Sequence, residues 1–114
     1  MAHILGVYGK LGISYSVDFL TPGTKTVVKS VTASANDGLI GGAIDDNIAE
    51  GNYDLKFRNM GVSGRMVCYA TKWNGAGFQH ILKKRVVKAG RTSLYKNVNV
   101  SESGGISLVP GFVF

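Results

Sequence analysis

The chain has 114 residues, of which 45% are hydrophobic and 18% are charged, and its formal net charge is +6. This length and composition are typical of a single globular domain that buries a core without metals or disulfides, and they exclude a disordered protein. No apolar run approaches the roughly 20 residues of a membrane-spanning helix, and no secretory signal pattern is visible. We therefore expect one domain over residues 1–114 that makes no membrane contact and is not secreted by a visible signal peptide.

The first half of the chain alternates apolar and polar residues, which is the pattern of half-buried strands. Residues 13–19 show this alternation, and the Pro22-Gly23 pair that follows predicts a type II turn, since proline presets φ and glycine permits a positive φ. Residues 27–33 are rich in β-branched side chains and predict a second strand. Asn36-Asp37-Gly38 predicts a hairpin turn.

The second half of the chain continues the β pattern. Only residues 43–49 could form a helical turn, and that segment is too short for an independent helix. Residues 53–58 are the clearest strand, with aromatic residues and Leu55 on one face and charges on the other. Further strands are predicted at residues 65–73, 79–89, 94–100 and 106–109. About eight short strands at ten-residue intervals predict an all-β fold, a single antiparallel β-sandwich or a partly closed barrel.

The same alternation predicts which side chains form the core, because residues two apart on a strand share a face. The expected core consists of Ile13, Tyr15, Val17, Phe19, Tyr53, Leu55, Phe57 and Trp73. Cys68 is the single cysteine and lies within an apolar run. We expect it to be a buried, unreactive packing residue.

Two short stretches carry a resemblance to a known family. Residues 35–40, Ala-Asn-Asp-Gly-Leu-Ile, and residues 50–57, Glu-Gly-Asn-Tyr-Asp-Leu-Lys-Phe, resemble the carboxypeptidase-regulatory-like (prealbumin-like) sandwich domains. Those domains carry an Asp-Gly hairpin and then a Pro-Gly-x-Tyr-x-Leu strand entry, whereas here Glu50 stands where proline is usual. The resemblance covers about 25 of the 114 residues. It implies a sandwich fold and no particular activity.

The chain as a whole is similar in type to accessory proteins of bacteriophage particles, such as capsid decoration proteins and small tail components. The similarity rests on a compact, cysteine-poor β-domain with 16 glycines that starts at Met1 and ends on an apolar strand, and no motif carries it. It implies a structural role and a place in the virion, with the cytoplasm as the alternative.

Motifs of catalysis and metal binding are missing from the sequence. His3 and His80 are the only histidines, and no Gly-x-Ser-x-Gly, His-Glu-x-x-His or Cys-x-x-Cys pattern occurs. The acidic residues near position 45 supply oxygens that calcium prefers, but they do not match the spacing of a calcium-binding loop. We therefore predict a protein that is not an enzyme and has no metal or cofactor.

The charge is divided along the chain, which points to an interaction surface. Residues 1–54 hold three lysines and six acidic residues, whereas residues 55–114 hold ten Lys or Arg and one acidic residue. On a strand, Lys83 and Arg85 would share one face and Lys84 and Lys88 the other. The predicted basic patch consists of Lys83, Lys84, Arg85, Lys88, Arg91 and Lys96. The predicted acidic loop consists of Asp45, Asp46 and Glu50.

Three functions remain open from the sequence. The leading hypothesis is a structural interaction module that assembles into a homo-oligomer or docks on a larger scaffold, with the basic patch meeting an acidic surface. The alternative is a β-barrel that binds single-stranded nucleic acid through residues 83–96, with Trp73, Phe78 or Tyr95 stacking on bases. A third hypothesis is a carbohydrate-binding sandwich that uses Trp73, Phe78 and Tyr69.

Overall fold

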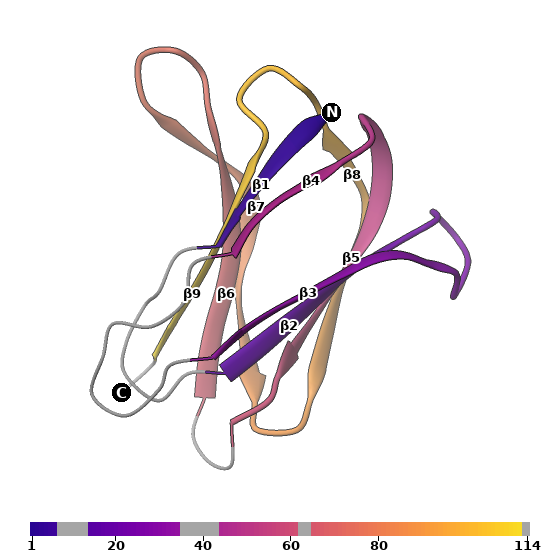
Figure 1. The fold of residues 1–114 in the computed structure, drawn as a ribbon. Helices are drawn as coiled ribbons and strands as arrows, with labels where there is room; N and C mark the ends of the chain where they lie inside the picture. The colour runs from indigo at the N-terminus through magenta and orange to yellow at the C-terminus, as the bar shows by residue number, and fades with distance from the viewer. Residues whose placement is uncertain (7–13, 35–43, 62–64, 113–114) are drawn as a thin grey trace.

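Within the part of the chain that the structure describes, nine strands pack into two facing sheets in the computed structural model (Figure 1). The structure describes residues 1–6, 14–34, 44–61 and 65–112. The strands are β1 (Ala2–Gly6), β2 (Ser14–Leu20), β3 (Val27–Ser34), β4 (Ile44–Ile48), β5 (Gly51–Asn59), β6 (Arg65–Trp73), β7 (Phe78–Lys88), β8 (Thr92–Val100) and β9 (Ile106–Phe112). The predicted all-β sandwich is thereby confirmed, and the barrel alternative is not what forms.

One sheet has five strands in the order β4-β1-β9-β6-β7, and the other has four in the order β3-β2-β5-β8. All neighbouring strands are antiparallel except β1 and β9, which run parallel. The edge strands of the two sheets contact each other in pairs, β3 with β4 and β7 with β8. Each open side of the sandwich is therefore bordered by one edge strand from each sheet.

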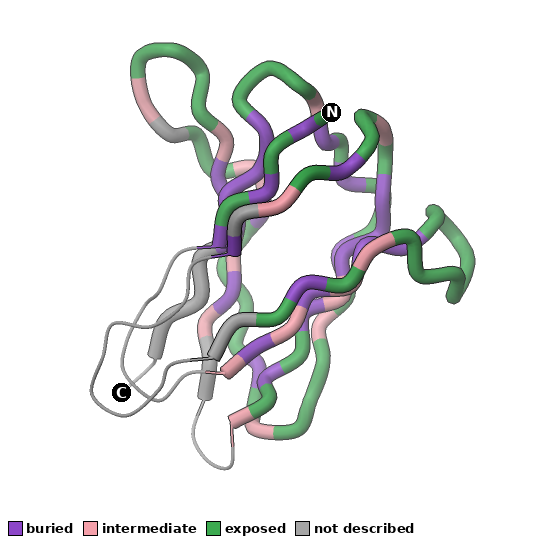
Figure 2. The backbone as a smooth tube through the Cα atoms, viewed as in Figure 1, coloured by how far each residue is buried: buried purple, intermediate pink, exposed green. Residues whose placement is uncertain are grey.

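The core lies between the sheets, as the purple segments of Figure 2 show. Tyr15, Val17 and Phe19 of β2 are fully buried, and so are Leu55 and Phe57 of β5. Rings meet edge-to-face across the strands, for example those of Phe57 and Tyr95, whose centroids are 5.6 Å apart. These burials, together with that of Tyr53, confirm most of the predicted core. Ile13 lies outside the described residues.

One member of the predicted core is wrong, because Trp73 is 45% exposed. The fully buried residues of β6 are Cys68 and Ala70, so alternation along the strand assigns Trp73 to the opposite, outer face. Trp73 is also the last residue of β6, beyond most of the core. The size and apolar character of a tryptophan side chain favour the core, but the face of the strand on which it lies decides its burial.

Two turns of the first half can be compared with their predictions. The Pro22-Gly23 turn is confirmed, since the amide of Thr24 donates to the carbonyl of Thr21 at 3.0 Å and Gly23 has φ of 75°. The one segment that could have formed a helical turn, residues 43–49, contains the strand β4 (Ile44–Ile48), which is paired along its length with β1. The pairing buries both isoleucines, so tertiary contact outweighs weak local helix propensity. The predicted Asn36-Asp37-Gly38 hairpin lies outside the described residues.

A buried carboxylate holds a bulge in the four-stranded sheet. Tyr53 pairs with Val98 and Leu55 with Tyr95, so Asp54 on β5 faces two residues of β8. One of these, Asn97, has a positive φ of 54°. Asp54 accepts hydrogen bonds from the backbone amides of Asn97 at 2.8 Å and Gly23 at 3.0 Å. Its carboxylate therefore supports both the β8 bulge and the β2–β3 turn.

β7 is interrupted by two bulges. Cys68 pairs with Arg85, Ala70 with Leu82 and Thr71 with His80. Lys83 and Lys84 therefore both stand opposite Tyr69, and Ile81 is an additional residue between the next two pairs. Bulges on an edge strand disrupt the ladder that another chain would extend.

Candidate interaction surfaces

All six residues of the predicted basic patch are exposed. Four lie on β7, Arg91 lies in the turn that follows, and Lys96 lies on β8. Because β7 and β8 belong to different sheets, this basic side is the place where two edge strands face each other. The six residues lie on or beside these two strands, but Lys84 lies over the outer face of the five-stranded sheet, and the six do not all have the same role.

Arg85 joins the two edge strands of this basic side. Its Nη1 donates a hydrogen bond of 2.6 Å to the carbonyl of Leu94 on β8, and its Cζ lies 4.0 Å from the ring centroid of Tyr95. A cation over an aromatic face is attracted by the ring, and the Leu94 carbonyl belongs to an edge strand. Arg85 therefore holds the side of the sandwich together, and this contact makes it less available to a partner than Lys83 or Lys88.

Tyr95 fills the interior beneath Arg85. The side chain is buried, and its hydroxyl shares its one proton between the carbonyls of Cys68, at 3.1 Å, and of Lys83. Burial raises the pKa of the Tyr95 phenol strongly. Tyr95 therefore serves the fold and offers no ring on which a nucleic-acid base could stack.

Cys68 is fully buried next to Tyr95, as the sequence predicts, with its Sγ 3.8 Å from the tyrosine hydroxyl. Burial is also the main cause of the raised pKa of the Cys68 thiol. A thiolate nucleophile needs an exposed site that lowers the pKa. The position of Cys68 is therefore that of a packing residue.

Two residues of the predicted acidic loop, Asp45 and Asp46, lie on the edge strand β4 and not in a loop. The carboxylate of Asp46 forms an ion pair of 2.7 Å with Lys29 on β3. The hydrogen bond from Lys29 is the largest cause of the lowered pKa of Asp46. Glu50, just before β5, accepts a hydrogen bond from the amide of Glu102 at 3.3 Å. The ion pair of Asp46 with Lys29 thus joins β4 to β3, just as the contacts of Arg85 join β7 to β8.

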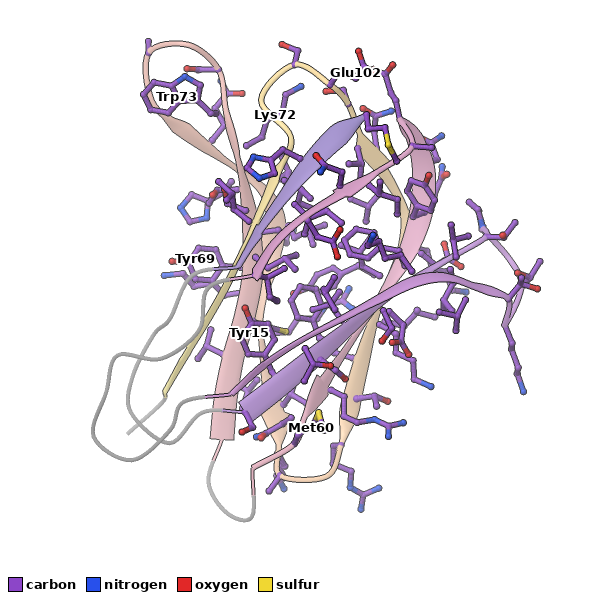
Figure 3. All side chains as sticks on the ribbon, viewed as in Figure 1. Tyr15, Met60, Tyr69, Lys72, Trp73 and Glu102 are labelled. Carbon is purple, nitrogen blue, oxygen red and sulfur yellow. The ribbon has the colours of Figure 1, made fainter. Side chains whose placement is uncertain are left out.

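An aromatic cluster lies on the outer face of the five-stranded sheet, and the sequence did not identify it as a unit. The ring of Tyr69 on β6 stacks on that of His80 on β7, with centroids 5.1 Å apart and an interplanar angle of 22°. Lys84 places its Nζ 5.3 Å from the centroid of the Tyr69 ring. Figure 3 shows Trp73 farther along the same hairpin, near its turn. The bulges of β7 bring His80 and Lys84 to the same tyrosine, and spacing alone does not reveal bulges.

Two hollows accompany these surfaces. A groove of about 320 Å³ lies between the β6–β7 hairpin and β8. It is lined by Lys72, Ile81, Leu82, Lys96, Asn97, Val98 and Asn99. A second hollow of about 410 Å³ lies over the four-stranded sheet, lined by Leu20, Val27 and Leu94 together with Asp18, Thr24, Lys25, Lys56 and Thr92. Of these two hollows, only the first lies beside the β6–β7 hairpin that carries the aromatic cluster, and lysines form part of its lining.

Within the described residues, no three His, Cys, Asp or Glu side chains come together in a way that could hold a metal ion. The part of the chain that the structure describes also contains no helix long and apolar enough to cross a membrane. Comparison with protein-family models, with curated proteins and with solved structures finds no match to this chain.

Proposed function

We propose that the protein is a non-catalytic structural module that assembles with copies of itself or docks on a larger scaffold, such as a virus particle. The observation that carries the proposal is the opposite charge on the two edges of one sheet. Asp45 and Asp46 lie on β4, whereas Lys83, Lys84, Arg85 and Lys88 lie on β7, and these are the two edge strands of the five-stranded sheet.

Opposite charges on opposite edges favour a head-to-tail contact, in which the β7 edge of one copy meets the β4 edge of the next. Complementary charge steers such a contact and fixes its orientation. A head-to-tail contact uses two different surfaces, so it closes into a ring or extends as a filament. A larger scaffold with an acidic surface would use the same β7 edge.

The contacts within the chain limit which charges such a partner can use. Arg85 is bonded to Leu94 and Asp46 is paired with Lys29, so both have roles inside the fold. Lys83 and Lys88 are exposed, and neither belongs to the ion pairs found among the described residues. Because bulges interrupt β7, the contact would rest mainly on side-chain charge rather than on a continuous ladder.

The test is a charge swap that spares the internal contacts. Lys83→Glu with Lys88→Glu should shift the protein toward monomer in sedimentation velocity at low salt. Adding Asp45→Lys to the same chain should restore part of the association, because the β4 edge then carries a reversed charge that complements the reversed charges of β7. The matched control is Lys25→Glu with Lys56→Glu, which changes the net charge equally at the hollow over the other sheet. Equal loss of association in the control would show that net charge, and not the edge, is responsible.

A further inference from the structure

The outer face of the β6–β7 hairpin presents aromatic rings along one line. Tyr69, Thr71 and Trp73 alternate on β6 and so share a face, with the two aromatic residues roughly 13 Å apart by strand rise. Trp73 is 45% exposed. His80, which stacks on Tyr69, is also exposed. Aromatic rings on an open sheet face are suited to stacking against planar or ring-shaped ligands.

The charge around these rings selects the class of ligand. Lys84 lies over the Tyr69 ring. Residues 55–101, which include β6, β7 and β8, contain ten Lys or Arg and no Asp or Glu. A neutral sugar gains nothing from this excess of cations, whereas a polyanion does. The combination of rings and cations favours a ligand that carries both bases and phosphates.

The groove on the other side of the hairpin extends the same positive surface. Lys72 precedes Trp73 on β6, and Lys72, Lys96, Asn97 and Asn99 supply the polar lining of the groove. Figure 3 shows Lys72 and Trp73 near the hairpin turn. Ammonium groups and side-chain amides are donors to phosphate oxygens, and the groove contains no acidic residue. A chain of phosphates that crosses the hairpin would thus meet cations on both of its sides.

We propose that the β6–β7 hairpin binds single-stranded nucleic acid, with bases stacked on Trp73 and on the Tyr69–His80 pair and with phosphates beside Lys84 and Lys72. Single strands fit better than duplexes because only unpaired bases can reach the rings. Apart from Lys84, whose charge also belongs to the β7 edge, this site uses residues other than those of the proposed edge contact and does not depend on it.

Binding can be followed directly, because Trp73 is the only tryptophan of the chain. The probes are oligo-dT and oligo-U, compared with a DNA duplex of equal length and with a neutral oligosaccharide. We expect the single strands to quench Trp73 fluorescence and the duplex to bind more weakly. The affinity should fall as salt rises, since phosphate contacts release counterions.

Variants test the assigned residues. Trp73→Ala should weaken single-strand binding about 5- to 150-fold, with recovery in Trp73→Phe, because a ring supplies the stacking energy. Lys84→Ala should make the log–log salt slope shallower by about 0.7, the value for one phosphate contact on a single strand. Lys25→Ala is the matched control and should leave affinity and slope unchanged.

Several outcomes would overturn the site. If a saturating concentration of oligonucleotide leaves Trp73 fluorescence unchanged, the oligonucleotide binds at another site or does not bind. Tighter binding of the duplex would exclude base stacking, and quenching by the oligosaccharide alone would make the face a carbohydrate site. Should Trp73→Ala fail to fold, the fluorescence of the wild-type protein and the affinity of Trp73→Phe still decide the question.

Discussion

The hydroxyl of Tyr95 on β8 donates a hydrogen bond to the backbone carbonyl of Cys68 on β6 and so joins the two sheets. This bond lies where the pairing of two strands is locally interrupted. Lys83 and Lys84 form a bulge opposite Tyr69, which interrupts the β6–β7 ladder next to Cys68. The same hydroxyl also reaches the carbonyl of Lys83. One tyrosine from the opposite sheet thus bonds carbonyls on both strands beside the bulge.

Tyr95→Phe should destabilise the protein by about 1–3 kcal/mol, because the buried carbonyl of Cys68 and the partly buried carbonyl of Lys83 would lose a donor. Chemical denaturation measures the loss. Tyr53→Phe is the matched control, since its hydroxyl bonds the carbonyl of Ala49 only four residues away at a partly buried position. If Tyr95→Phe lowers the unfolding free energy no more than Tyr53→Phe does, the hydrogen bond between the sheets contributes no more to stability than a local one.

The pH dependence of stability should reveal Asp54. The backbone amide of Asn97, and then that of Gly23, lower the pKa of the Asp54 carboxyl from its ordinary value of 3.8. A lowered pKa in the folded state means that the stabilisation is complete above about pH 4 and is lost as the pH falls through the folded-state pKa. Asp54→Asn should therefore flatten the decline of the unfolding free energy below pH 4.

Salt should distinguish Asp54 from Asp46, whose pKa is lowered chiefly by Lys29. The main partners of Asp54 are neutral amides, with the charge of Lys96 a smaller contribution, whereas Asp46 is part of an exposed ion pair that salt screens. At roughly 1 M salt the effect of Asp46→Asn on the pH profile should shrink, while that of Asp54→Asn should persist. Equal shrinkage of both effects would contradict the assignment of the amides as the cause.

Two glycines with positive φ should respond differently to substitution. Gly105 has φ of 58°, and a Cβ there would collide with the carbonyl oxygen of His3, whereas Gly90 has φ of 75° and no atom within 4 Å of such a Cβ. Gly90→Ala should cost about 1–2 kcal/mol of conformational strain. Gly105→Ala should cost at least about 1 kcal/mol more, because the start of β9 must also move away from β1. Similar thermal midpoints for the two variants would be inconsistent with the close approach.

Cys68 should react slowly with a thiol reagent in the native protein, because it is fully buried and its thiol pKa is raised. Adding denaturant should bring the rate to that of a free thiol. Cys68→Ala should leave association unchanged and lower stability modestly. Rapid modification under native conditions would contradict the packing role.

The strands of the core could be predicted from sequence because their signal is local. β2 and β5 alternate regularly, and their inner residues are buried as expected. The pairing of β4 with β1, in a segment that could have formed a helical turn, depends on residues roughly forty positions away. A short stretch of sequence does not show which distant strand it pairs with.

The sequence predicts which charged residues belong to the candidate surfaces, but not the contacts that these residues make. The sequence located the cations of β7, yet Arg85 and Asp46 are partly occupied by contacts with β8 and β3 that join the sheets. The stack of Tyr69 on His80 depends on the bulges of β7, and Trp73, expected in the core, is exposed. Each of these features is a relation between strands, and alternation along one strand cannot show it.

The most direct test of the assembly proposal is the solution mass of the wild-type protein, free of nucleic acid, at low and at high salt. We predict species heavier than the 12.1 kDa monomer at low salt, and dissociation as salt screens the charges of β4 and β7. A single 12.1 kDa species at every concentration and at both salt levels would contradict self-assembly through these edges.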